Sequence, residues 1–403
     1  MKKGSGVLAV MLCVAMLACA CVAPESSENK EPESSDNKQQ VEEKEYQGKL
    51  DQIEPSAYDN VEGLHLEAGS YISIIGKAEE GQYWNEVKKG VDQAAADIND
   101  YLGYEGKDKV KVTYSGPETE DNVDEQVNIL DEELARYPIA VGISITDANA
   151  CEVQFDLAAE NDIPVVAYDS GSDYQGLMAT VSTDNTKSAK EAADKLAEAM
   201  SSKGKVLILA HDSKSMAAKE RVAGFKAELK KKYPKMSVAS VYYMDNIEKL
   251  QKNVAAEINT GTYARSTDGD ARLRTGDEKI NPTYITEDDI IDYYLQKHPD
   301  VCGCFATNAT AVKTIVSGMD RTKKDNVMVV GYDADKEEID MLKKGKVDGL
   351  VVQNPYAMGY ASVIAAARSA LSMGNESVVD TGYTWITKSN LNDNEVKKML
   401  YNE

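Results

Sequence analysis

Histidine and cysteine, the residues that most often carry metal and redox chemistry, are scarce in this sequence. Its 403 residues contain three histidines and six cysteines, and three of the cysteines fall within the first 21 residues. The later ones, Cys151, Cys302 and Cys304, lack the additional partners that a metal or redox site needs. We interpret them as small buried apolar residues and expect no metal site.

Motifs that mark common catalytic sites are also missing. The chain has no phosphate loop, no dinucleotide-binding glycine fingerprint, no His-Glu-x-x-His zinc motif and no Gly-x-Ser-x-Gly nucleophile elbow. We therefore expect a binding protein without a cofactor rather than an enzyme.

Positive charge is in deficit. Lysine and arginine number 45 against 68 aspartates and glutamates, a formal net charge of −23. Such a surface repels phosphate backbones and anionic lipid headgroups, which argues against nucleic acid as a partner. The length is sufficient for two globular domains of ordinary size.

The first 21 residues have the pattern of an export signal. Lys2 and Lys3 precede an apolar run over 7–20, which is too short to span a bilayer but typical of a signal-peptide core. The run ends in Met-Leu-Ala-Cys-Ala-Cys, which resembles the bacterial lipobox, and either Cys19 or Cys21 fits the position of the lipidated cysteine. An ordinary secretory signal is the alternative. We expect an extracytoplasmic protein that contacts the membrane through a lipid anchor alone.

Residues 22–68 are interpreted as a disordered tether. The segment from 22 to about 56 is rich in Ser, Glu, Lys, Asn and Gln and offers little apolar surface to bury. Such a chain cannot offset the entropy cost of ordering.

From Tyr71 onward, short β-branched runs alternate with helical periodicity. After the strand-like run 71–76, apolar residues recur every three or four positions from Trp84 to Leu102, which predicts one apolar helix face. The alternation continues to about Gln353, with a new series of strands from about Leu177. It predicts an α/β fold of doubly wound parallel sheets, in which near-continuous apolar runs are buried strands.

One stretch interrupts this alternation. Residues 259–284 carry Gly, Thr, Asp and Arg with little apolar periodicity, and a loop of this length is unusual in a compact domain. Asp268-Gly269-Asp270 superficially matches a calcium loop, but the remaining oxygen ligands are not at the required spacing. We interpret the stretch as a surface excursion.

Six segments, in order, resemble the type I periplasmic binding proteins, specifically the ribose- and galactose-binding branch. The likeness extends from Tyr71 to about Asn390. Its segments are Gly81–Gly90, the strand Ile163–Asp169, the basic helix start Ala217–Phe225, His298–Asn308, Val330–Asp333 and Val352–Gly359.

The resemblance implies two α/β lobes joined by a three-crossing hinge near 168–171, 353–355 and 382–384. It implies an N-terminal lobe of 69–169 and 354–381, and a C-terminal lobe of 170–353 and 382–403. It further implies a monomer that captures a small polar ligand, most simply a monosaccharide, for the permease of an ABC importer.

Polar residues at the predicted strand ends are the candidate site, because ligands of open parallel sheets bind beyond the carboxyl ends of the strands. These residues are Asp147, Asp169, Asn308, Asp333 and Gln353. Carboxylates and amides suit the hydroxyl groups of a polyol. Tyr83 and Trp84 offer flat rings for its C–H face, and Lys219 and Arg221 are candidate donors.

Each candidate has a structural alternative. Tyr83 or Trp84 could be a core aromatic, the strand-end aspartates could be helix N-caps, and Lys219 or Arg221 could be solvated. The chain also departs from the branch at Lys77, Gly81, Ser170 and Lys219, which leaves the particular ligand open.

Three other functions are compatible with parts of this pattern. Repressors with this fold require a DNA-binding helix-turn-helix in place of an export signal. A sensor that presents ligand occupancy to a membrane kinase or chemoreceptor would use the same cleft for a sugar or an autoinducer-2-like signal. An exported enzyme on a similar sheet would need a nucleophile–base pair, and the sequence shows none.

Overall fold

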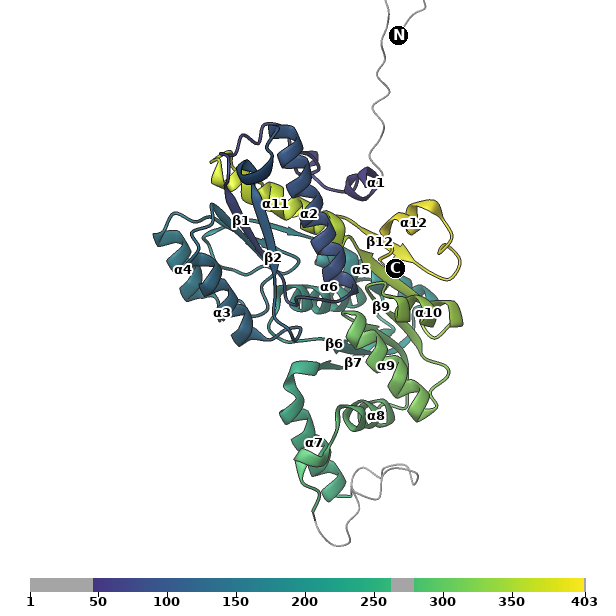
Figure 1. The fold of residues 1–403 in the computed structure, drawn as a ribbon. Helices are drawn as coiled ribbons and strands as arrows, with labels where there is room; N and C mark the ends of the chain where they lie inside the picture. Colours follow the sequence, from purple (N-terminus) through teal and green to yellow (C-terminus); the bar gives the residue numbers. More distant parts are fainter. Residues whose placement is uncertain (1–45, 262–278, 402–403) are drawn as a thin grey trace, which may run out of the picture. The chain divides into compact units, whose positions relative to one another are not determined.

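The computed structural model describes residues 46–261 and 279–401, whose strands form two six-stranded sheets (Figure 1). Each sheet, with its helices, makes one lobe, as predicted. Cys19, Cys21 and Asp268-Gly269-Asp270 lie outside the described residues.

Lobe 1 is built on an all-parallel sheet with strand order β11-β5-β4-β3-β1-β2. Its strands are β1 (Tyr71–Ile75), β2 (Lys111–Ser115), β3 (Ala140–Ile143), β4 (Val165–Tyr168), β5 (Leu177–Ser182) and β11 (Val378–Asp380). Its helices are α2 (Gln82–Leu102), α3 (Val123–Leu134), α4 (Glu152–Glu160) and α11 (Pro355–Ala370). α2 and α11 pack on one face of the sheet, and α3 and α4 pack on the other.

Lobe 2 is built on a sheet with strand order β12-β10-β9-β8-β6-β7, in which β12 alone runs antiparallel to its neighbour. Its strands are β6 (Gly204–Ala210), β7 (Met236–Tyr243), β8 (Val301–Ala306), β9 (Met328–Tyr332), β10 (Gly349–Gln353) and β12 (Tyr383–Ile386). Its helices are α5 (Asn185–Ala199), α6 (Met216–Lys232), α7 (Ile247–Asn259), α8 (Glu287–Lys297), α9 (Ala309–Thr322), α10 (Lys336–Lys344) and α12 (Asn394–Met399). α5 and α6 cover one face, and the other helices cover the opposite face.

The two sheets repeat the same strand order, position for position, so β4 of lobe 1 corresponds to β9 of lobe 2. Both strands end in a tyrosine that is followed by an aspartate, and both aspartates, Asp169 and Asp333, have positive φ (56° and 80°). Each donates its backbone N–H to the next strand, Asp169 to Val181 O (2.9 Å) and Asp333 to Val351 O (2.8 Å). Each lobe therefore places one aspartate, in the same backbone conformation, directly after an equivalent strand.

Close contact between α2 and α11 depends on two glycines. A Cβ atom on Gly90 would lie 2.0 Å from Tyr356 O, and one on Gly359 would lie 2.0 Å from Val87 O. Since these are backbone atoms, a side chain at either position would force the helices apart.

The chain crosses between the lobes three times, after β5, between β10 and α11, and between β11 and β12. The predicted boundary at Asp169 is wrong, because β5 pairs with β4 in the lobe 1 sheet and the first crossing follows Ser182. The apolar pattern identified β5 as a strand, but such a pattern does not say which sheet a strand joins.

The predicted tether is also too long. Its last part, residues 46–68, includes the helix α1 (Gln47–Leu50), and Leu50, Ile53 and Tyr58 are buried in the lobe 1 core. Glu54 and Asp380 exchange backbone hydrogen bonds of 2.8 and 2.9 Å, and Asn354 Nδ2 donates to Lys49 O (2.7 Å). This part of the chain is therefore ordered against the second and third crossings.

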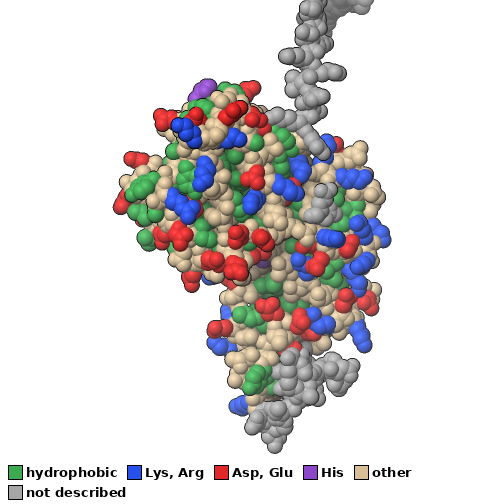
Figure 2. Space-filling model, in the orientation of Figure 1, with side chains coloured by type: hydrophobic (Ala, Val, Ile, Leu, Met, Phe, Trp, Pro, Cys, Tyr) green, Lys and Arg blue, Asp and Glu red, His purple; other side chains and the backbone are tan. Residues whose placement is uncertain are grey.

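Figure 2 shows acidic and basic side chains interspersed over both lobes on the face drawn. Among the described residues, no helix has the length and apolarity needed to cross a membrane. Cys302 is exposed, so the expectation that all three later cysteines are buried is wrong for this one.

Candidate ligand-binding site

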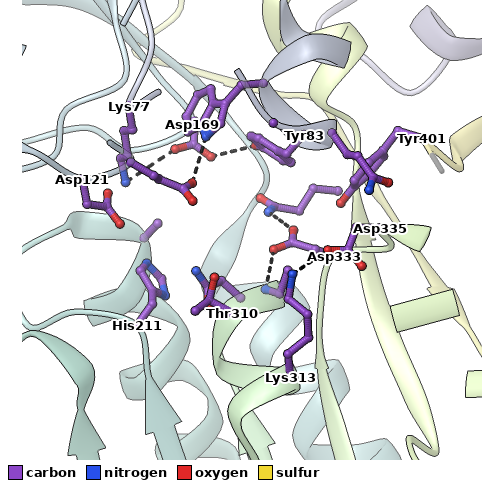
Figure 3. A pocket seen from close by; sticks show the side chains of 18 of the residues that line it. Lys77, Tyr83, Asp121, Asp169, His211, Thr310, Lys313, Asp333, Asp335 and Tyr401 are labelled. Carbon is purple, nitrogen blue, oxygen red and sulfur yellow. Dashed lines mark hydrogen bonds and ion pairs between the residues drawn. The ribbon is translucent and has the colours of Figure 1, made fainter. Parts of the chain in front are cut away.

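A polar cavity of about 290 Å³ lies between the carboxyl ends of the two sheets (Figure 3). Its volume is near the lower end of the range for small-molecule sites. Lobe 1 contributes Lys77, Glu80, Gly81, Gln82, Tyr83, Trp84, Glu120, Asp121 and Asp169. Lobe 2 contributes His211, Ala217, Arg221, Asn308, Ala309, Thr310, Lys313, Asp333, Asp335, Gln353 and Tyr401.

Arg221 organises the lobe 2 side. Its guanidinium donates three hydrogen bonds: Nε to Asn185 Oδ1 (2.8 Å), Nη1 to Thr307 O (2.7 Å) and Nη2 to Gln353 Oε1 (2.6 Å). It also lies over the Tyr332 ring, 4.0 Å from the centroid. A planar fork held in this way is pre-organised, so its position does not depend on a ligand.

Asp333 is held by the same network. Gln353 Nε2 donates to its Oδ1 (2.7 Å), and the backbone N–H of Ala309, at the start of α9, donates to its Oδ2 (3.0 Å). Burial raises the pKa of Asp333, although Arg221 and these donors oppose the shift. The carboxylate keeps free lone pairs for a hydroxyl group.

On the lobe 1 side, Asp169 is bound by two hydroxyl groups. Tyr83 donates to its Oδ1 and Ser144 to its Oδ2, both at 2.8 Å. Lys77 Nζ forms an ion pair with Oδ2 at 3.7 Å, as Figure 3 shows. Burial alone would lower the pKa of Lys77, but Asp169 and the other nearby carboxylates outweigh it and raise the pKa.

Tyr83 and Trp84 lie in the first turn of α2 and meet edge to face, with ring centroids 5.1 Å apart. Trp84 Nε1 donates to Glu120 Oε1 (2.8 Å), and the side chain is also part of the lobe 1 core. The two interpretations of Trp84, core aromatic and cavity wall, therefore both hold.

His211 follows β6, the strand of lobe 2 that corresponds to β1, and so it occupies the place that Lys77 has in lobe 1. Its Nδ1 lies 2.7 Å from Thr307 Oγ1 and its Nε2 lies 3.2 Å from Asp212 Oδ2. Burial, with Lys77 and Arg221 nearby, lowers the pKa of His211 to about 3 against the pull of Asp212. The ring is neutral at physiological pH.

The lobes touch around the cavity. The rings of Tyr83 and Tyr401 meet edge to face at 5.9 Å, and the backbone N–H of Lys336 donates to Gln82 Oε1 (3.0 Å). Burial and nearby carboxylates raise the pKa of both tyrosines well above the usual value, so both remain protonated.

Seven of the nine sequence-predicted site residues line the cavity: Tyr83, Trp84, Asp169, Arg221, Asn308, Asp333 and Gln353. Asp147 and Lys219 are not among its lining residues. Asp147 lies four residues beyond the end of β3, where it pairs with Lys214 at 3.5 Å. Lys219 is exposed because it lies two positions from Arg221, and such positions face away from each other on a helix. Asn308 lines the cavity and also caps α9, since its side chain accepts from Ala311 N–H.

Several lining residues were not predicted. Lys77 and His211 could have been, because each closely follows a buried strand. Glu120 and Asp121 lie farther along a loop after β2, and Tyr401 follows the last helix, α12. None of the three directly follows a strand, so the strand-end rule could not identify them. Among the described residues, no cluster of His, Cys, Asp and Glu is arranged to hold a metal ion.

Two equivalent sheets, three crossings and a polar cavity between them define a two-lobed binding protein of type I architecture. The chain belongs to the periplasmic binding protein family, because residues 72–269 and 272–375 match the model of the periplasmic binding protein domain.

Known relatives agree with this assignment. The ribose import binding protein RbsB of Bacillus subtilis is 24% identical over 227 residues, 56% of this chain and 61% of the relative. RbsB of Escherichia coli is 24% identical over 224 residues, which cover 63% of its length. The match thus spans about three-fifths of these curated relatives.

Solved structures show the same fold over a larger share of the chain. A carbohydrate transporter solute-binding protein from Agrobacterium radiobacter, in complex with D-arabinose, is 29% identical, with a TM-score of 0.65 over 83% of this chain and 99% of that one. A glucose–galactose binding protein from Geobacillus stearothermophilus, GanP, is 21% identical, with a TM-score of 0.63 over 80% and 99%.

Proposed function

We propose that this chain captures a monosaccharide outside the cytoplasm and presents it to the permease of an ABC importer. The observation that carries the proposal is the pair of equivalent aspartates, Asp169 and Asp333, which enter one cavity from opposite lobes. A hydroxylated ring between them accepts hydrogen bonds from Arg221, Lys77 and Asn308 and donates to both carboxylates.

The two-lobed arrangement lets ligand binding change the conformation that a permease would recognise. A ligand that contacts both lobes binds more tightly to the closed form and shifts the population toward it. Three crossings permit hinge closure but forbid free rotation of the lobes. A permease that binds the closed form would therefore recognise the loaded protein. The names of the relatives, which include ribose import binding proteins, support this function.

A thermal-shift screen of monosaccharides, nucleosides and autoinducer-2 tests the proposal. A monosaccharide at one hundred times its Kd should add about 2.7 kcal/mol to the unfolding free energy. The proposal would be contradicted if a nucleoside or autoinducer-2 stabilised the protein and no monosaccharide did. Binding of the loaded protein to the permease in membranes then separates transport from sensing.

We further propose that lipid on Cys19 or Cys21 holds the protein to the membrane. The support is the lipobox-like sequence at the end of the apolar run. Replacing both cysteines with serine should release the protein from the membrane fraction and leave ligand affinity unchanged, because the lipid is remote in sequence from every cavity residue. Unchanged fractionation of the double variant would contradict the anchor.

A further inference from the structure

Lys77 places a buried ammonium at the cavity with no direct hydrogen bond to any described residue. Its side chain is 6% exposed, and its contact with Asp169 Oδ2, at 3.7 Å, is an ion pair longer than a hydrogen bond. An ammonium has three N–H donors, and burying them unpaired costs free energy. A side chain this deeply buried, with its donors free and its nitrogen beside the cavity, indicates that a ligand oxygen completes its bonding.

The charge around Lys77 is strongly negative. Four carboxylates act on its ammonium: Asp169, Asp121, Asp212 and Glu120. His211, which also lines the cavity and is close enough to Lys77 to feel its charge, is neutral because its pKa is lowered to about 3. One ammonium therefore faces four carboxylates.

The described contacts leave this negative charge only partly compensated. Glu120 accepts one hydrogen bond, from Trp84, whereas the Asp121 carboxylate accepts none from the residues that the structure describes. Burial raises the pKa of both carboxyls even though Lys77 opposes it. Repulsion from Asp121 adds to the upward pKa shift of Glu120, and repulsion from Asp212, Asp169 and Asp245 adds to that of Asp121. The corner thus lacks positive charge.

At the opposite end of the cavity, each lining carboxylate has a basic side chain beside it. Lys313 Nζ pairs with Asp335 Oδ2 at 2.8 Å, and the Arg221 guanidinium lies close enough to stabilise the Asp333 carboxylate. Among the carboxylates that line the cavity, those without a basic partner of their own therefore lie in the lobe 1 corner.

Building on the proposed function, we propose that the ligand is a polyhydroxylated molecule with an ammonium group, whose cation enters the corner beside Asp121 and Glu120. Its hydroxyl groups then meet Asp169, Asp333 and Arg221, and one of its oxygens accepts from Lys77. Tyr83 and Trp84 lie next to the same corner and offer aromatic surface that also favours a cation. The same surplus of carboxylates disfavours a sugar acid or a sugar phosphate, despite the lysine.

Calorimetry at neutral pH and low salt tests this charge preference with sugars that differ in one charged group. Glucose, galactose and mannose are each compared with their 2-amino and 6-amino derivatives and with their uronic acids. In the series that binds, an amino sugar should bind about tenfold more tightly than the neutral sugar, or about 1.4 kcal/mol. The uronic acid should bind more weakly than both, and added salt should reduce the differences.

Three variants sharpen the comparison through the ratio of amino-sugar to neutral-sugar affinity. Asp121→Asn and Glu120→Gln should each lower this ratio, whereas Lys77→Met should raise it because the resident cation is removed. Asp147→Asn, which changes an acidic residue outside the cavity lining, should leave the ratio unchanged.

The outcomes separate this inference from the proposed function. If neutral and amino sugars bind equally, or if a uronic acid binds best, the charge preference is wrong and sugar capture stands. If no member of any series binds and the monosaccharide screen is also empty, the proposed function falls and the inference with it.

Discussion

The two lobes place equivalent aspartates in the cavity but support them differently. Asp333 belongs to a network in which Arg221, Gln353 and the start of α9 are joined by direct hydrogen bonds. Asp169 is held by two hydroxyl groups and by Lys77, whose ammonium makes no direct hydrogen bond with the described residues. The lobe 2 side is already held in place by direct hydrogen bonds, whereas the ammonium of the lobe 1 side keeps its donors for a ligand.

The contrast has a physical origin in the two basic side chains. A guanidinium is planar and fixes several acceptors at once, whereas an ammonium on a flexible stem acts as a point charge. The lobe 2 side is therefore suited to orient a ligand, and the lobe 1 side is suited to select it by charge. Four predictions test this division.

Removal of Arg221 should have the largest effect. Arg221→Leu leaves Asn185, Gln353 and the Asp333 carboxylate without their shared partner, so we expect a loss of about 3–5 kcal/mol in unfolding free energy. Urea denaturation measures it. Lys219→Leu, an exposed position on the same helix, should change stability by less than about 0.5 kcal/mol. Equal effects of the two variants would show that the network is not what stabilises lobe 2.

Removal of either equivalent aspartate should weaken binding. Asp333→Ala and Asp169→Ala each delete a charge-assisted hydrogen bond to a hydroxyl group, which is worth about 1.5–3 kcal/mol. Calorimetry with the identified ligand measures the change. Asp147→Ala should stay within about twofold of the parent, or about 0.4 kcal/mol. If Asp333→Ala also stays within twofold, the cavity is not the binding site.

Lys77→Met should produce a smaller, pH-dependent loss of stability. Without the ammonium, the pKa values of Asp121 and Glu120 should rise further, so the folded protein holds protons that the unfolded chain has released. Stability of the variant should therefore fall as pH rises above about 4, the usual carboxyl range. Melting temperatures across pH measure this slope, with Lys88→Met, an exposed lysine of α2, as the control. A deficit that does not vary with pH would contradict a charge-balancing role.

His211→Gln should have the smallest effect, confined to acid. Because burial lowers the folded-state pKa of His211 to about 3, the unfolded chain binds this proton more readily between about 3 and 6.5. The stability contribution of His211 is present above that window and is lost as pH falls through it. The variant should lose less melting temperature on acidification than the parent. His65→Gln, at an exposed position, should behave like the parent.

The sequence by itself determined the type of each main element and much of the cavity. Near-continuous apolar runs predicted buried strands such as β4 and β10, and the strand-end rule identified Asp169, Asp333 and Gln353. These inferences work because they depend on local periodicity and on a general property of parallel sheets.

The tertiary structure alone decided which sheet took β5, which of two nearby basic residues entered the cavity, and whether residues 46–68 were ordered. Arg221 and Lys219 lie on different faces of α6, and only the face that carries Arg221 is buried. Which face is buried depends on how α6 packs against the sheet and against α5. Residues 46–68 bury Leu50 and Tyr58 against a lobe 1 core that includes α11, which lies some 300 residues later in the chain. The negative charge around Lys77 was also decided by the tertiary structure, because its carboxylates come from separate loops of both lobes. Contacts between distant segments are set by how elements pack, and local sequence patterns do not record them.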